Sequence, residues 1–395
     1  MKTGRNISRN VTNAPTKFSL GQELAFVSLP QVLNSLTSLR FFAAAIVVVH
    51  HTLPGWSHYS LTYRVAQFGD LGVTFFFILS GFVLTWAQQS AKKTQDIYVF
   101  LRLRFARIYP LHFVFLIVTA VAYLGFKLTL AGYPNASTLT IFSQLFLVHG
   151  WIPFHPQIRQ GLNGVSWTLS LEFFFYLMTI PIYRILQAKS NKALIAICIS
   201  LYSAYGILVW ITTFNHSLKM DNLIWYYPPF RLPEFIYGMT LAVLIRRERE
   251  KSIIIPTWIS LTAAAAAITL YSELVTNKNR FSSQYNFLMI PFFLFIIWSF
   301  ARKDMLGRKG FMSGKVLVLL GEESYALYIS HAVLLGIYTY ALHNLGGNIQ
   351  NSRAGDLITI CFVMCAMTLA RLLHTIIEIP CQKFLKKKWH LAGPS

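Results

Sequence analysis

The stretch SLRFFAAAIVVVHH, from Ser38 to His51, decides the fold of this chain. It contains an unbroken apolar run between an arginine and two histidines. A helix rises about 1.5 Å per residue, so about 20 mainly apolar residues cross the hydrocarbon core of a bilayer. Such blocks recur through the 395 residues, of which 55% are hydrophobic and 12% charged, whereas about a quarter of a soluble domain is charged. The sequence therefore predicts an all-α, polytopic integral membrane protein.

Ten apolar blocks have about the length of a membrane-spanning helix. Their approximate bounds are 37–53, 68–87, 108–127, 166–187, 193–214, 229–245, 253–272, 285–301, 322–343 and 355–377. A further apolar stretch, 138–151, is short for a span and contains His149. We read it as an interfacial or re-entrant segment.

The Lys and Arg residues indicate the orientation, because short cytoplasmic loops accumulate positive charge. Most of the 35 lie in segments that are inside when the N-terminus is cytoplasmic. We therefore predict that both termini are cytoplasmic. A basic face against anionic lipid also accounts for the net charge of +21, so membrane lipids are expected partners and nucleic acid is not.

The chain is expected to form a single membrane domain over residues 34–379. Residues 1–33 are polar and basic and lack the apolar core of a signal peptide, which predicts a disordered cytoplasmic arm. Residues 380–395 form a basic cytoplasmic tail. The four cysteines show neither a disulfide pattern nor metal-ligand spacing, so no metal site is predicted.

Ionisable side chains within a span are costly, about 2.5 to 3.5 kcal/mol each on insertion scales, and therefore point to function. Arg40 and His51 are eleven positions apart, which at 100° per residue is three turns plus 20°. They share one helix face about 16 Å apart along the axis, whereas His50 points about 100° away. Taken alone, Arg40 could simply reach lipid phosphates and His51 could be an interfacial residue.

Basic and acidic residues also mark the next two blocks. Asp70 lies at the outer end of GDLGVTFFFILSGFVLTW, whose glycines suit close helix packing. In FLRLRFARIYPLH, Arg104 and Arg107 are three residues apart, close enough on a helix to hold one phosphate together. Anchoring by basic residues next to a span is the simpler reading of Arg102 and its neighbours.

Further polar residues lie in later blocks. Glu172, within GVSWTLSLEFFFYL, is a carboxylate among phenylalanines and is predicted in the outer half of its helix, near His51. Arg231 and Glu234 are spaced to neutralise each other. Imidazole and carboxylate groups on the outer side suit proton transfer, and the inner arginines suit a phosphorylated molecule.

In their order along the chain, these motifs resemble the acyltransferase-3 family of membrane O-acyltransferases. Arg40 and His51 fit its first-span signature. The other matching segments are Gly72–Phe82 ending in SGF, Arg104–Pro110 with RxxR-IYP, Trp167–Glu172 with WTLSLE, and Ser324–His331 with SYALYISH. We expect two departures from the family pattern: Thr74, where many members carry Asp, and a membrane form that stands alone, without the C-terminal hydrolase-like domain of some members.

The resemblance implies transfer of an acyl group, usually acetyl, from acyl-CoA to a hydroxyl of a cell-surface or exported glycan or glycolipid, in the bacterial plasma (inner) membrane. Acyl-CoA would be a co-substrate, with no tightly bound cofactor. On this reading His51 is the base or nucleophile, and Glu172 orients it or offsets its charge. CoA would be held by Arg40, Arg104, Arg107, Ser324 and Tyr325, and the acceptor by Asp70, Trp167, Arg231, Glu234 and His331.

Two alternatives come from other classes of protein. A proton-coupled secondary transporter of a glycan or small anion would use buried His, Glu and Arg as a relay. It would normally show two related halves, which this sequence does not. An inactive scaffold in glycan assembly is disfavoured because Arg40, His51 and Glu172 are all present.

Overall fold

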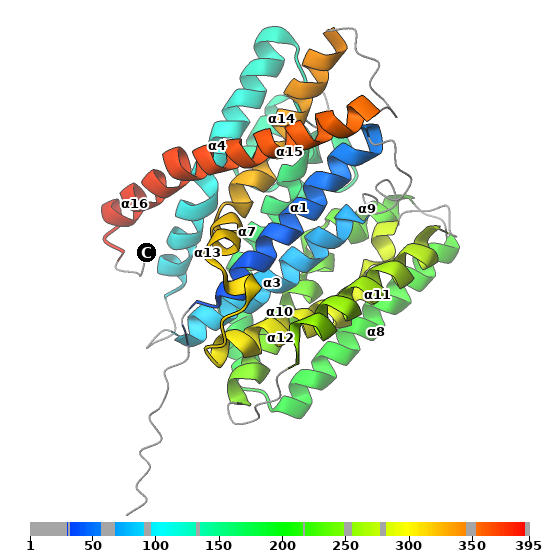
Figure 1. Cartoon of the computed structure of the whole chain (residues 1–395), viewed down its shortest axis with the longest axis vertical. Coiled ribbons are helices and arrows are strands. Elements are labelled where there is room, and N and C mark those ends of the chain that lie inside the picture. Colours follow the sequence, from blue (N-terminus) through cyan, green and yellow to red (C-terminus); the bar gives the residue numbers. More distant parts are fainter. Residues whose placement is uncertain are drawn as a thin grey trace, which may run out of the picture.

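The computed structural model describes residues 30, 32–56, 68–90, 96–131, 135–215, 218–248, 255–276, 282–344 and 353–391. These residues form helices joined by turns, without a strand among them (Figure 1). The predicted arm at 1–33 lies almost wholly outside the described residues, as does the end of the predicted tail.

The longer elements are helices of membrane-spanning size, and short helices connect them. Their bounds are α1 Asn34–Trp56, α3 Gly69–Ser90, α4 Ile97–Phe126, α5 Thr138–Leu145, α6 Pro156–Arg159, α7 Trp167–Gln187, α8 Asn191–Asn215, α9 Leu218–Tyr226, α10 Pro228–Arg247, α11 Thr257–Thr276, α12 Ile290–Met305, α13 Lys315–Glu322, α14 Ser324–Asn344, α15 Arg353–Leu373 and α16 Ile379–Lys388. A π-helical turn, His374–Glu378, joins α15 to α16.

Each of the ten predicted blocks falls on a helix, and seven segments among the described residues are long and apolar enough to cross a membrane. The blocks outside these seven belong to α10, α11 and α14. In α10, Arg231 and Glu234 lower the mean hydropathy, but both side chains are buried inside the protein. The protein is thus a multi-pass, all-helical membrane protein. The count of ten spans and the inward orientation of the termini stay predictions.

The segment predicted as interfacial or re-entrant contains no spanning helix. Its one α-helix, α5, has 8 residues and is about 12 Å long, less than half the thickness of the hydrocarbon core. The chain then turns through a short 3-10 helix at His149–Trp151.

Helices α1 and α3 run side by side through the middle of the bundle, between α4, α14 and α15 on one side and α8, α11 and α12 on the other (Figure 1). Helix α10 packs tightly against α3 because each contributes a glycine at the crossing. A methyl group at Gly81 would overlap the Phe235 carbonyl, and one at Gly238 would overlap the Ile78 carbonyl. This close approach places the polar residues of α10 directly against α3.

Helix α4 begins well before the predicted start at residue 108. The Asp96 side chain caps it by accepting a hydrogen bond from the Tyr98 amide at 2.8 Å. Arg104 and Arg107 are therefore one helical turn apart inside a packed helix, rather than in a segment leading into it.

Candidate active site

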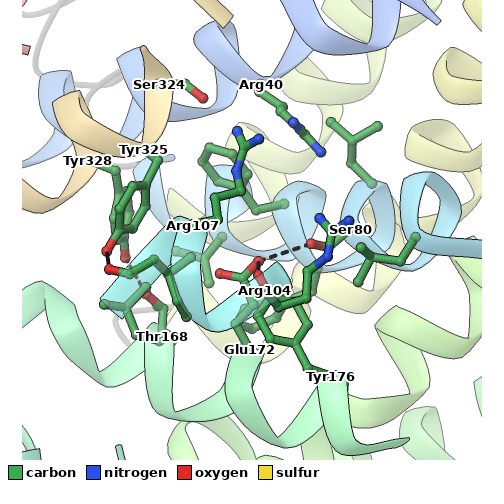
Figure 2. Close-up of a pocket in the computed structure, with 17 residues that line it drawn as sticks. Arg40, Ser80, Arg104, Arg107, Thr168, Glu172, Tyr176, Ser324, Tyr325 and Tyr328 are labelled. Carbon is green, nitrogen blue, oxygen red and sulfur yellow. Dashed lines mark hydrogen bonds between the residues drawn. The ribbon is translucent and has the colours of Figure 1, made fainter. Parts of the chain in front are cut away.

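One cavity collects all five residues that were predicted to hold CoA. It covers about 820 Å³, including space open to solvent, between α1, α3, α4, α7 and the start of α14, and we call it the arginine cavity (Figure 2). Its lining is Arg40, Val73, Phe76, Phe77, Leu79, Ser80, Leu84, Arg104, Arg107, Ile108, Thr168, Leu169, Glu172, Tyr176, Ser324, Tyr325 and Tyr328.

The three arginines of this cavity have no fixed partner. No side chain in the described part of the chain forms a hydrogen bond or ion pair with Arg40, Arg104 or Arg107, although Glu172 lies within electrostatic range of Arg40 and Arg104. The guanidinium groups converge on the cavity from α1 and α4 (Figure 2). With one carboxylate against three guanidinium groups, the cavity has excess positive charge and suits an anion.

Glu172 is held by hydroxyl groups of the same cavity. Its Oε1 accepts hydrogen bonds from the Tyr176 hydroxyl at 2.6 Å and from Ser80 Oγ at 3.2 Å. The structure does not bring Glu172 to His51, because the turn of α7 that carries Glu172 faces α3 and α4 at the level of the arginines. Position along one helix could not show which neighbours that helix would have.

Ser324 and Tyr325 border the arginine cavity as well. Each hydroxyl donates to a backbone carbonyl, Ser324 to Gly321 at 2.7 Å and Tyr325 to Ile108 at 2.5 Å. The Tyr325 bond ties α14 to α4, so this side chain shapes the wall of the cavity that contains the arginines.

A second cavity of about 1290 Å³ contains His51, and we call it the histidine cavity. Its lining is Val47, His50, His51, Gly69, Asp70, Val73, Thr129, Leu130, Ala131, Gln160, Gly164, Val165, Trp167, Trp225, Tyr226, Tyr328, Ala332, Leu335, Gly336 and Thr339. The side chain of His51 is exposed to it.

Two pairs of polar side chains meet at this cavity. His51 Nδ1 lies 2.9 Å from His331 Nε2. His50 Nε2 lies 4.0 Å from an oxygen of Asp70. The helix geometry directs His50 away from His51, but both side chains border the same cavity, and the neighbour of His50 there is Asp70.

Aromatic rings form another wall of the histidine cavity. The predicted acceptor-binding residue Trp167 packs against Tyr226, with ring centroids 4.7 Å apart, and against Trp225 at 5.8 Å. Trp225 and Tyr226 were not among the predicted site residues. The aromatic run IWYYPPF, which spans the boundary between α9 and α10, could have indicated an aromatic wall here. Rings of this kind present apolar faces with polar edges, which suits a ligand that has both kinds of surface.

The two cavities are adjacent, because Val73 of α3 and Tyr328 of α14 line both; we call this shared boundary the junction. Arg40 and His51 border different cavities from the same helix. A long ligand with its anionic end among the arginines could therefore extend past Val73 and Tyr328 toward His51.

Arg231 and Glu234, which the sequence predicted to contact the acceptor, line neither of these two cavities. Both are buried, with exposed fractions of 0% and 3%, and their side chains pair at 3.0 Å. The Arg231 guanidinium lies 4.2 Å from the ring centroid of Trp225, so the pair supports the aromatic wall from behind. Their spacing on α10 favours mutual neutralisation, which is the alternative reading from the sequence.

Comparison of the sequence with known proteins identifies the family. The family described as "Acyltransferase domain" matches residues 33–373. The chain belongs to this acyltransferase family. Acyltransferase MdmB of Streptomyces mycarofaciens is 30% identical over 377 residues, which are 90% of this chain and 93% of that protein.

Two more distant relatives of this acyltransferase carry related names. Putative acetyltransferase ORF330 of Acidianus two-tailed virus is 27% identical, over 76% of this chain and 84% of its own. O-acetyltransferase OatA of Staphylococcus aureus is 25% identical over 76% of this chain, but that match covers 50% of OatA. No solved structure matches the chain.

The acyltransferase has a carboxylate next to Thr74, where many family members carry Asp. Thr74 Oγ1 lies 3.3 Å from Glu234 Oε1 and 3.1 Å from Arg231 Nη2. Glu234, reaching across from α10, thus supplies negative charge beside a threonine that has none.

Proposed function

We propose that this acyltransferase moves an acyl group, acetyl in the simplest case, from acyl-CoA in the arginine cavity to a hydroxyl of a glycan or glycoside in the histidine cavity. The observation that carries the proposal is that the two cavities share Val73 and Tyr328 as a boundary, with the arginines on one side and His51 on the other. The donor would cross this boundary to bring its acyl group to His51.

The donor would bind through its phosphates. Arg40, Arg104 and Arg107 are unpaired, and guanidinium groups match phosphate oxygens in pairs. Ser324 and Tyr325 would border the same end of the donor. The pantetheine arm would then pass Val73 and Tyr328 and present its thioester to His51.

The transfer step uses His51 as the base. Its neutral imidazole takes the proton of the acceptor hydroxyl as the hydroxyl oxygen attacks the thioester carbonyl carbon. The C–O bond forms, the C–S bond breaks, and the CoA sulfur leaves with the proton that His51 returns. The aromatic wall of Trp167, Trp225 and Tyr226 would hold the sugar, with Asp70 accepting from a hydroxyl.

The topology predicted from the basic residues determines the side of the membrane from which each substrate would enter. With the N-terminus inside, Arg40 lies toward the cytoplasm, where acyl-CoA is made, and His51 lies toward the outer leaflet. We therefore propose that the protein lies in the plasma membrane with its acceptor on the outer side. A transporter would not need an unpaired arginine cluster beside the path, and the family comparison favours the enzyme.

The test uses the full-length protein in its own membrane. A strain lacking the gene is complemented with the wild type, His51→Ala or Arg102→Ala, and its surface glycans and glycosides are analysed by mass spectrometry. We expect one glycan to lose an acetyl mass in the deletion strain and to regain it with the wild type and Arg102→Ala, but not with His51→Ala. Full restoration by a membrane-inserted His51→Ala would refute the proposed role of His51.

A further inference from the structure

The partner of His51 is itself a histidine with a second fixed hydrogen bond. His331 Nδ1 lies 2.6 Å from the backbone carbonyl oxygen of Tyr328, and His331 Nε2 lies 2.9 Å from His51 Nδ1. Three groups are thus linked in series, from a carbonyl oxygen through one imidazole to another.

The chemistry of these atoms determines where the protons lie. A carbonyl oxygen only accepts, so His331 Nδ1 must carry the hydrogen of that bond. A neutral imidazole has one N–H, which leaves His331 Nε2 as an acceptor. His51 Nδ1 must then be the donor, and the lone pair of neutral His51 lies on Nε2.

The relative orientation of the rings agrees with this direction of donation. The ring planes of His51 and His331 differ by 19°, and their centroids are 5.1 Å apart. The distance between the centroids is longer than the 2.9 Å between the two nitrogens by nearly the sum of the two ring radii. The two nitrogens therefore lie close to the line that joins the centroids, and the two rings lie nearly in one plane. An N–H directed along an in-plane lone pair is the favourable geometry for a hydrogen bond.

His331 is held more firmly than His51. Its exposed fraction is 0%, whereas His51 is exposed to the cavity. The turn of α14 before it is anchored to the segment leading into α7. The Tyr328 hydroxyl accepts from Thr168 at 2.9 Å (Figure 2), and Asn163 donates to the Ile329 carbonyl at 3.0 Å.

We propose that His331 is a positioning residue, which fixes the tautomer of His51 so that Nε2 presents its lone pair to the acceptor hydroxyl. The inference rests on the proposed role of His51. In a Ser-His-Asp triad a carboxylate holds the histidine in this way, and changing that carboxylate to its amide costs about 10⁴-fold in kcat. Here a neutral imidazole has this role, and its own tautomer is set by the Tyr328 carbonyl.

Two amide variants of His331 separate positioning from simple packing. The amide oxygen of glutamine lies as many bonds from Cα as His331 Nε2, so His331→Gln retains an acceptor for His51 Nδ1. The amide of asparagine lies at the distance of Nδ1 and stops short of His51. We expect His331→Gln to keep most of kcat, and His331→Asn to lose about 100-fold or more with an unchanged KM for acetyl-CoA.

Equal activity of the two amide variants, whether both are active or both inactive, would overturn the proposal. A large rise in the KM for acetyl-CoA in His331→Asn would also do so, because it would indicate a collapsed site. Each variant is first checked for monodisperse elution of the full-length protein in detergent.

The tautomer can also be read without any assay of acyl transfer. In protein labelled with ¹⁵N-histidine, the His51 signals, assigned by their loss in His51→Ala, should show protonated Nδ1 and unprotonated Nε2. In His331→Leu they should move toward a mixture of the two tautomers. A wild-type His51 with its proton on Nε2 would refute the inference even if the enzyme is active. The expected tautomer in a protein without transferase activity would instead count against the proposed function.

Discussion

Arg40 and His51 project from one face of α1 into different cavities, Arg40 among the arginines and His51 beside the aromatic wall. They are eleven residues apart on a continuous helix, which separates their Cα atoms by about 16 Å along its axis. A single helix therefore sets the distance between the proposed phosphate site and the reacting thioester. The donor must be long enough to bridge it, which favours acyl-CoA over a short acyl phosphate.

The arginine cavity should bind the donor through its charges. Replacing Arg104 or Arg107 with alanine removes a charge-assisted hydrogen bond worth about 1.5 to 3 kcal/mol, so the Kd for acetyl-CoA should rise about 10- to 100-fold. Isothermal titration of the purified full-length protein measures this directly. Arg102→Ala is the matched control, because Arg102 is on the same helix but is exposed and borders neither cavity. An equal loss of affinity in Arg102→Ala would indicate a general charge effect.

The junction between the cavities should control transfer separately from binding. Val73→Phe adds bulk at a residue that is 6% exposed and borders both cavities. We expect acyl transfer to fall at least about 10-fold, since a misplacement of about 1 Å can cost 10²-fold, while the Kd for acetyl-CoA stays within a factor of about two.

The control for this junction variant is Val83→Phe, which makes the same change on the same helix at a position that borders neither cavity. It tests overpacking alone, which typically costs about 1 to 3 kcal/mol of stability. If Val83→Phe reduces transfer as much as Val73→Phe does, the cavities do not communicate through Val73.

Helical periodicity was sufficient to place the polar residues of α1 and α4. The shared face of Arg40 and His51 and the pairing of Arg104 with Arg107 follow from 100° per residue, and the structure brings Arg40, Arg104 and Arg107 to one cavity. Contacts between helices did not follow from the same rule. Glu172 and His331 lie on helices whose rotation is set by packing, so the contacts of Glu172 with Ser80 and of His331 with His51 were not evident from sequence. Tyr176, four residues after Glu172 on the same helix, is a partner that helical spacing does allow.

The buried pair on α10 should be needed for stability rather than for acceptor contact. Glu234→Leu leaves the fully buried Arg231 without its counter-ion, and breaking such a pair typically costs about 3 to 5 kcal/mol. The double variant Arg231→Met/Glu234→Leu removes both charges and should recover much of the loss. Thermal unfolding of the wild type, Arg231→Met, Glu234→Leu and the double variant in detergent gives the coupling energy. Additive losses would mean that the two side chains do not depend on each other.

The crossing of α3 and α10 should not tolerate a methyl group at Gly238. An alanine there would overlap the Ile78 carbonyl, and neither backbone can withdraw without separating α10 from α3, the helix that lines both cavities. We expect Gly238→Ala to lower the free energy of unfolding by at least about 1 to 3 kcal/mol, the usual cost of overpacking. Gly125→Ala is the control, because a methyl group at Gly125 of α4 meets nothing within 4 Å and alanine favours a helix. Thermal unfolding should therefore show a loss for Gly238→Ala and none for Gly125→Ala, whereas wild-type stability of Gly238→Ala would mean that the two helices can separate at little cost.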